Sequence, residues 1–170
     1  MEASDELGTF HRGEKCAELG YGGDKTENVI WRIEHGELDG YTAKAVMPMI
    51  GTNNNYYDTT NPTNVALAIE KIVKIIGEKQ PKAKIFMCAI LPRGNSSKSK
   101  GHSDVRRRND ITNEVLREFA KHNPDVRFLD MSKDFLDESG CVPASLMADQ
   151  VHPTDAGYDI LIKAVKDLVF

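Results

Sequence analysis

The sequence predicts an α/β domain built around a parallel sheet with helices on both faces. Short apolar segments alternate with longer segments whose apolar residues recur at helical spacing. Two of the short segments, Ala43–Ile50 and Lys84–Leu91, are almost continuously apolar, as is typical of strands covered on both faces. A length of 170 residues fits one domain, and we find no second-domain linker, so we expect a single domain over residues 1–170.

Four segments are expected to form strands. They are Cys16–Leu19, Ala43–Ile50, Lys84–Leu91 and Val126–Leu129. One residue disagrees with an interior position for the second of these strands. Pro48 cannot donate to a hydrogen-bond ladder and is tolerated best at the edge of a sheet.

Turn and capping residues mark the first two helices. Asp24 and Glu27 have the spacing of a capping box, and Gly36 can end the helix behind them in a left-handed conformation. Asn61-Pro62 has the form of an N-cap followed by proline at the first helical position, and Gln80-Pro81 ends that helix.

Two further helices are expected in the second half of the chain. Arg106–His122 carries an apolar stripe, and a last amphipathic helix begins at Asp155. Between the predicted elements, Gly51-Thr52-Asn53-Asn54 has the composition of a turn. Residues 95–103 are polar and are expected to form a surface loop.

Composition excludes several classes of protein. A net charge of −4 argues against a general nucleic-acid binder, and no apolar run reaches the length needed to cross a bilayer. The first residues are acidic and lack the apolar region of a signal peptide, so we expect a cytoplasmic protein by default, and a secreted one if an upstream segment has been lost, which leaves localisation open. Three cysteines, Cys16, Cys88 and Cys141, show no metal-ligand spacing, and no metal site is expected.

The segment Asp149-Gln150-Val151-His152-Pro153 carries the clearest chemistry. A carboxylate three residues before an imidazole can accept a hydrogen bond from one ring nitrogen, which leaves the other nitrogen free to take a proton. The alternative is that the aspartate is a local cap of the turn.

Four segments in this order resemble the signature blocks of the SGNH (GDSL-type) hydrolases, and most closely their platelet-activating-factor acetylhydrolase-like branch. The resemblance runs from about residue 16 to residue 170. It rests on residues 20–32 with Gly36-Glu37-Leu38, on Gly51-Thr52-Asn53-Asn54, on Leu91-Pro92-Arg93-Gly94 and on Asp149–Pro153. It implies a three-layer α/β/α sandwich with a parallel sheet.

The resemblance also implies roles for individual residues. His152 would be the general base and Asp149 the residue that orients it, while the backbone N–H of Gly23 and the side-chain amide of Asn53 would form the oxyanion hole. The implied activity is hydrolysis of an acetyl or other short acyl ester of a carbohydrate or lipid. It would need no metal or organic cofactor, and its partner would be a small-molecule ester.

The family's first block, Gly-Asp-Ser, carries the serine nucleophile and is absent here, so no nucleophile is visible. Ser4 is too close to Gly23, Cys16 falls in the predicted first strand, and Ser96, Ser97 and Ser99 lie in the polar loop. We therefore expect an N-terminally truncated chain that lacks the family's first strand and is a very poor esterase.

Three hypotheses follow from the missing block. The chain is a fragment of an active esterase, or an inactive homologue that binds an acylated ligand, or a chain that folds with a partner supplying the strand. In each case the loss would make Ala43–Ile50 an edge, with the Pro48 nitrogen facing the vacated position. Such an apolar edge could pair with a second copy of the chain.

Overall fold

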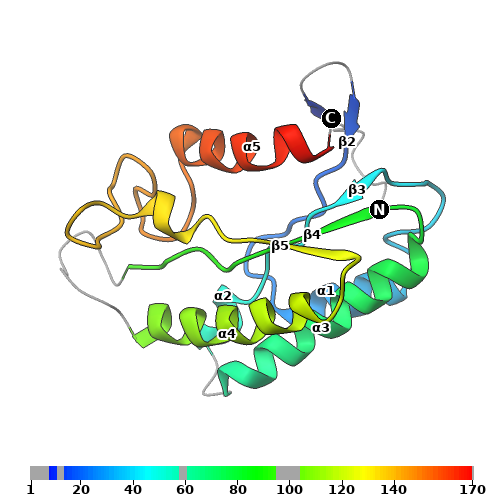
Figure 1. The fold of residues 1–170 in the computed structure, drawn as a ribbon, viewed down its shortest axis with the longest axis horizontal. Helices are drawn as coiled ribbons and strands as arrows, with labels where there is room; N and C mark the ends of the chain where they lie inside the picture. Colours follow the sequence, from blue (N-terminus) through cyan, green and yellow to red (C-terminus); the bar gives the residue numbers. More distant parts are fainter. Residues whose placement is uncertain (1–7, 11–13, 58–60, 95–103, 170) are drawn as a thin grey trace.

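The computed structural model describes residues 8–10, 14–57, 61–94 and 104–169 (Figure 1). Its centre is a parallel sheet in the order β3-β4-β5, formed by β3 (Ala45–Val46), β4 (Lys84–Cys88) and β5 (Val126–Leu129). Ala45 pairs with Lys84, and Ile85 pairs with Val126. The predicted α/β class with a parallel sheet is confirmed.

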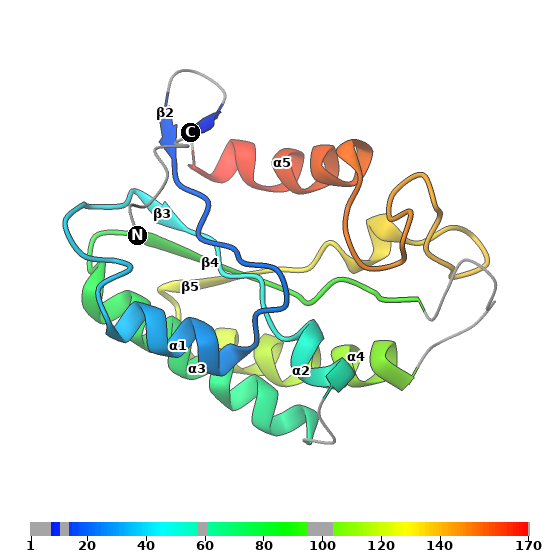
Figure 2. The same ribbon diagram turned by 180° about the vertical axis from the view of Figure 1, so that it is seen from behind.

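Helices cover both faces of this sheet (Figures 1 and 2). One layer holds α1 (Thr26–Glu34), α3 (Pro62–Lys79) and α4 (Asp104–Lys121), and α5 (Asp155–Val169) lies across the opposite face. Side chains of β4 alternate between the two layers. Ile85 and Met87 belong to the larger apolar cluster with α1, α3 and α4, whereas Cys88 packs with Leu161 of α5 and with the short helix η1 (Ser132–Phe135).

The predicted helix boundaries agree closely with the structure. Asn61 Oδ1 accepts a hydrogen bond from the Thr63 N–H at 3.0 Å, so α3 begins as its cap and proline predict. Gly36 follows α1 with a φ of +104°, the left-handed conformation that glycine adopts most easily. The last helix begins at Asp155, as predicted.

The predicted strand Cys16–Leu19 is wrong. The chain instead forms a hairpin of β1 (Gly8–Phe10) and β2 (Glu14–Cys16), which pair antiparallel and form a separate sheet. Pairing with the nearby β1 costs less chain entropy than pairing with a strand of the central sheet, because the loop to be closed is shorter. Beyond Cys16 the chain runs on without regular structure to the turn before α1, and Leu19 packs against the larger apolar cluster.

Pro48 shortens β3 to two residues, and the predicted direction of its nitrogen is wrong. The Cys88 N–H donates to the Pro48 carbonyl at 3.1 Å. In an extended strand the nitrogen and carbonyl of one residue point to the same side, so the Pro48 nitrogen faces β4, where it cannot donate. Among the strands that the structure describes, β3 pairs with β4 alone, so the edge position expected for this segment is observed.

A helix replaces the turn expected after this strand. Residues Thr52–Tyr57 form α2, although three successive asparagines have low helix propensity. Asn54 and Asn55 are buried, and their amides bond to neighbouring elements. These tertiary hydrogen bonds override the local preference.

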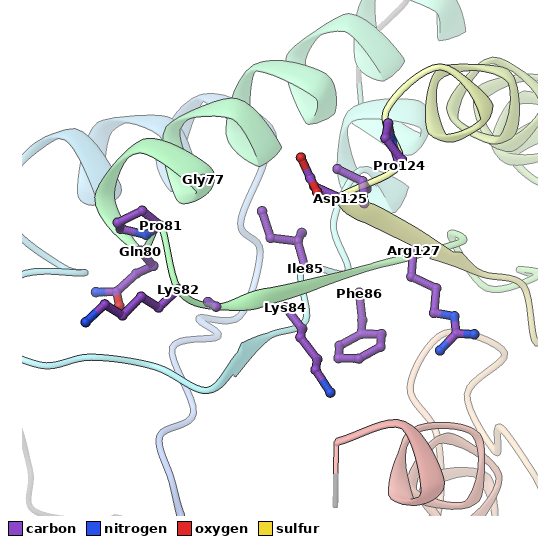
Figure 3. A pocket seen from close by; sticks show the side chains of 12 residues that line it. Gly77, Gln80, Pro81, Lys82, Lys84, Ile85, Phe86, Pro124, Asp125 and Arg127 are labelled. Atoms are coloured by element: carbon purple, nitrogen blue, oxygen red, sulfur yellow. The ribbon is translucent and has the colours of Figure 1, made fainter.

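A hollow of about 670 Å³ opens at the amino ends of β4 and β5 (Figure 3). Figure 3 shows Ile85 on one side of β4, and Lys84 and Phe86 on the side that faces α5. In open parallel sheets, sites form at the carboxyl ends of the strands. This hollow therefore lies at the opposite end of the sheet from the residues predicted to act.

Gly51, which joins β3 to α2, has no room for a side chain. Its φ is +120°, and a Cβ there would lie 2.8 Å from Ile90 Cδ1 and 3.1 Å from Ile69 Cδ1. We expect Gly51→Ala to lower the free energy of unfolding by about 1–3 kcal/mol more than Gly40→Ala, measured by urea denaturation. Gly40 is the matched control because its φ is +83° and nothing lies within 4 Å of an added Cβ. Equal losses in the two variants would show that the close packing around Gly51 contributes nothing.

Candidate active site

Asp149 and His152 form the hydrogen bond that their spacing predicts. Asp149 Oδ2 lies 2.6 Å from His152 Nδ1, and Asp149 Oδ1 accepts the backbone N–H groups of Val151 and His152 at 2.9 and 2.8 Å. The carboxylate thus holds both the backbone and the ring of the histidine. This leaves His152 Nε2 as the ring nitrogen that can exchange a proton with a ligand.

These hydrogen bonds keep the carboxylate ionised. The bond from the His152 ring, followed by the bond from the His152 backbone N–H, holds the pKa of Asp149 well below its usual range. The pair is open to solvent, since the His152 side chain is 78% exposed and the Asp149 side chain 54% exposed. A ligand can therefore reach the imidazole directly.

Asn53, one of the predicted oxyanion donors, bonds to the residue that follows Gly23, the other predicted donor, although the two are 30 residues apart in sequence. Asn53 Nδ2 donates to the backbone carbonyl of Asp24 at 2.9 Å, which fixes the Asn53 amide beside the turn that contains Gly23. Gly23 has a φ of +84°, and nothing within 4 Å would meet a side chain there, so its backbone is open to approach. Both residues keep an N–H that could bind a developing oxyanion.

The turn before α1 is anchored by an arginine and not by the predicted capping box. Asp24 accepts from Arg32 Nη1 at 2.9 Å and from Nη2 at 2.6 Å, and Glu37 accepts from Arg32 Nε at 2.7 Å. The hydrogen bond with Asp24 is the main reason that the pKa of Arg32 lies above its ordinary value. The N-cap of α1 is instead Lys25, whose backbone N–H donates to Asn28 Oδ1 at 3.0 Å. A bidentate ion pair outcompetes a neutral cap because both of its partners are charged.

One asparagine amide, that of Asn54, fixes α2 against α1 through two hydrogen bonds. The Thr26 N–H donates to Asn54 Oδ1 at 3.0 Å, and Asn54 Nδ2 donates to Glu27 Oε2 at 3.0 Å. Asn54 follows Asn53 directly in α2. These bonds therefore orient the helix that presents the Asn53 amide.

A buried amide network on α4, which the sequence did not reveal, ties α2 to the carboxyl end of β4. Asn55 Nδ2 donates to Asn109 Oδ1 at 3.0 Å and to Thr112 Oγ1 at 3.1 Å, and Asn109 Nδ2 donates to the Leu91 carbonyl at 3.2 Å. Asn113 pairs with the N–H and the carbonyl of Ile90 at 2.8 and 2.9 Å. The one signal in the sequence is that these polar side chains recur on the side of α4 that faces the core.

The segment after β4 reaches the Asp149–His152 turn. The Gly94 N–H donates to the Gln150 carbonyl at 3.2 Å, and the Arg93 guanidinium lies 4.1 Å from the centre of the Tyr56 ring. Burial lowers the pKa of Arg93, while Tyr56, Tyr57 and Asp149 act in the opposite direction. Arg93 thus packs on Tyr56 at the end of α2 and is within electrostatic range of the carboxylate that orients His152.

The predicted residues therefore form two pairs, Gly23 with Asn53 and Asp149 with His152, which α2, Arg93 and Gly94 connect. Within the described part of the chain, Asp149 is the only hydrogen-bond partner of the His152 ring, so no nucleophile is in place there. Cys88 is a poor nucleophile because burial raises the pKa of its thiol to about 12. Ser4, Ser96, Ser97 and Ser99 lie outside the described residues.

The described ranges contain no group of three or more His, Cys, Asp or Glu side chains that could hold a metal ion. None of the helices in those ranges is long and apolar enough to span a bilayer.

The depressed pKa of Asp149 predicts a specific pH dependence of stability. The contribution of a carboxylate with a lowered pKa is complete above its unfolded-state pKa of about 3.9 and is lost as the pH falls toward the folded-state pKa. The midpoint of thermal unfolding should therefore be higher for the natural chain than for Asp149→Asn above about pH 5, and this difference should shrink below about pH 4.

Asp137→Asn is the matched control for this experiment. Asp137 also has a lowered pKa because it accepts from the Ser139 hydroxyl and from the N–H of Cys141, but it lies in a different turn. It should reproduce the acid dependence of stability without affecting any esterase activity. A constant difference between the natural chain and Asp149→Asn from pH 2 to pH 6 would contradict the assigned hydrogen bonds.

Comparison with known proteins identifies the family of this chain. The model of the GDSL-like lipase/acylhydrolase family matches residues 6–160. Platelet-activating factor acetylhydrolase IB subunit alpha1 from Bos taurus is 32% identical over 151 residues, which cover 89% of this chain and 62% of that protein. The chain thus spans about three-fifths of the length of the curated relatives that it matches.

Solved structures share the same fold. A GDSL-like lipase from Bacteroides thetaiotaomicron superposes with a TM-score of 0.71 at 20% identity, covering 86% of this chain and 71% of that one. An acetyl-xylooligosaccharide esterase from Geobacillus stearothermophilus superposes with a TM-score of 0.69 at 20% identity, covering 91% and 72% of the two chains. The extent of the family match and the identity to the curated relatives show that the chain belongs to the GDSL-like lipase/acylhydrolase family.

Proposed function

We propose that this chain carries the acid–base pair and the oxyanion hole of a serine-dependent ester hydrolase. His152 is the general base, Asp149 orients it, and the N–H groups of Gly23 and Asn53 bind the oxyanion. The observation that carries the proposal is the 2.6 Å contact between His152 Nδ1 and Asp149 Oδ2. It fixes the tautomer that leaves Nε2 free to accept the proton of an attacking hydroxyl.

The oxyanion donors suit acyl transfer. Attack on an ester carbonyl builds negative charge on one oxygen, and N–H groups already held in place stabilise that charge without reorganising during the reaction. The bond from Asn53 to the Asp24 carbonyl immobilises one donor beside the other. Both donors are neutral, so neither forms an ion pair with the imidazole or with the substrate.

The substrate in this proposal is an acetyl or other short acyl ester of a carbohydrate or lipid. One similar protein is named as an acetylhydrolase and another as an acetyl-xylooligosaccharide esterase, so an acetyl group is common to both names. In this reading the nucleophilic serine comes from a further strand beside β3, whose outer edge is open among the described strands. The mechanism requires no metal or organic cofactor.

In the alternative, the chain keeps the oxyanion donors but catalyses no reaction. A homologue without a nucleophile would bind an acylated ligand through the same oxyanion donors, or would become active only with a partner that supplies the strand. The absence of a second partner for the His152 ring in the described residues favours this alternative over an esterase complete in this chain. Adding the missing strand to the chain distinguishes these hypotheses.

The test extends the chain with a strand that carries Gly-Asp-Ser and measures hydrolysis of p-nitrophenyl acetate. The unextended chain should be a very poor catalyst, since sites that lack a triad member retain only about 10³–10⁴-fold acceleration over water. The extended chain should gain several orders of magnitude. His152→Ala should then remove about 10⁴-fold or more of the rate.

His122→Ala is the matched control, because His122 is an exposed histidine at the end of α4 whose ring contacts the Glu118 carbonyl. Its rate should equal that of the unmodified extended chain. A folded extended chain with no gain in rate would favour the inactive homologue. Conversely, a turnover near or above about 1 s⁻¹ in the unextended chain, abolished by His152→Ala, would reveal a nucleophile already present.

A second prediction concerns the oxyanion hole in the extended chain. Asn53→Ala should lower kcat by about 10²–10³-fold with little change in KM, because the lost N–H acts chiefly in the transition state. Asn64→Ala, an exposed asparagine in the first turn of α3, should leave both parameters unchanged. An equal rise in KM with kcat preserved would instead assign Asn53 to ground-state binding.

A further inference from the structure

Gln150, between Asp149 and His152, has an unusual backbone conformation. Its φ is +67°, and it is the only non-glycine residue with a positive φ in the ranges that the structure describes. A residue with a Cβ is rarely stable in this left-handed region unless its surroundings hold it there. Gln150 is also buried, with 7% of its surface exposed, whereas Asp149 and His152 on either side are exposed.

The buried side chain and backbone of Gln150 supply that restraint. Its Nε2 donates to the carbonyls of Val142 and Met147, both at 3.2 Å, and its own N–H donates to Met147 at 3.0 Å. Its carbonyl accepts the Gly94 N–H at 3.2 Å. Bonds of Gln150 thus join the turn to the loop before it and to the segment after β4.

We propose that Gln150 is the positioning residue of the Asp149–His152 pair. The reversal of the chain at Gln150 is what brings the N–H groups of Val151 and His152 onto the single oxygen Asp149 Oδ1. The same reversal places the His152 ring against Asp149 Oδ2. Gln150 touches no reacting atom and acts only through its neighbours. The inference rests on the proposed function for its catalytic meaning, although its structural content can be tested without activity.

Gly94 leaves the space that the Gln150 side chain occupies. A Cβ on residue 94 would lie 2.1 Å from Gln150 Oε1, 2.9 Å from Cδ and 3.0 Å from Cβ. Gly94 is therefore glycine because the Gln150 side chain occupies the space beside it. An alanine at 94 must displace Gln150, and a shorter residue at 150 should relieve most of that conflict.

The experiment compares Gln150→Glu, Gln150→Ala, Gly94→Ala and the double variant Gly94→Ala/Gln150→Ala by NMR. The readouts are hydrogen exchange of the Val151 and His152 amides, measured relative to amides in β4, and the downfield Nδ1–H resonance of the His152 ring. Glutamate keeps the shape of glutamine but has no N–H donor. In each single variant we expect the relative protection of both amides to fall by about tenfold, which corresponds to the loss of one or two hydrogen bonds. We also expect the ring resonance to broaden or shift. The losses of Gly94→Ala and Gln150→Ala should be markedly less than additive in the double variant.

Gln80→Glu is the matched control. Gln80 is also buried, at 3% exposure, and its Nε2 also donates to two backbone carbonyls, those of Leu38 and Tyr41. It should lower overall stability without changing the relative protection of Val151 and His152 or the ring resonance.

Two results would overturn the inference. The first is that the Gln150 variants lower stability, as Gln80→Glu does, but leave the relative protection of the Val151 and His152 amides and the ring resonance as they are in the natural chain. The other is full additivity of Gly94→Ala and Gln150→Ala. In the extended chain, Gln150→Glu should lower kcat and leave KM unchanged. If His152→Ala has no effect there, the proposed function fails while the exchange data still decide the role of Gln150.

Discussion

The buried amide of Asn109 joins segments that must meet if the candidate site is to exist. The Asn109 amide accepts a hydrogen bond from Asn55 of α2 and donates one to the Leu91 carbonyl just beyond β4. Thr112 and Asn113 lie on the same side of α4 and bond to the same two segments. Buried amides cost free energy when their polar groups lack partners, and the oxygen and the nitrogen of the Asn109 amide are both bonded in this arrangement, which therefore favours it over others. Apolar packing alone would not fix the rotation of α2, and the position of Asn53 depends on that rotation.

The fold was largely predictable because its signals are local or periodic. Asn61-Pro62, Gly36 and Asp155 mark helix ends by their own conformational preferences, and the apolar run Lys84–Leu91 identifies the central strand. The hydrogen bond between Asp149 and His152 was predictable for the same reason, since the partners are three positions apart in the sequence. Helix α2 was missed because the bonds that stabilise it come from Asn109 and Thr112, more than 50 residues away. The Asp24 cap was wrong because Arg32 competes for the same carboxylate.

The two halves of the candidate site differ in how they are held. Gly23 and Asn53 rest on partly or fully buried ion pairs and amides around Asp24, Arg32 and Asn54. Asp149 and His152 are exposed and depend on one buried residue, Gln150, which bonds the turn to the protein. Among the described residues, Gly94 bonds this turn to the segment after β4, and the charge of Arg93 acts on the same turn. In the proposed mechanism, this arrangement combines a firmly held oxyanion hole with an imidazole that a ligand can reach from solvent.

The crystal structure of this chain with acetate, the carboxylate product of the proposed reaction, tests the central claim most directly. We expect one acetate oxygen within hydrogen-bond distance of the Gly23 N–H and Asn53 Nδ2, with His152 Nε2 facing the other oxygen. Acetate bound elsewhere, or a His152 ring that stays more than about 10 Å from both donors, would contradict it, because no single ester could then contact all three groups.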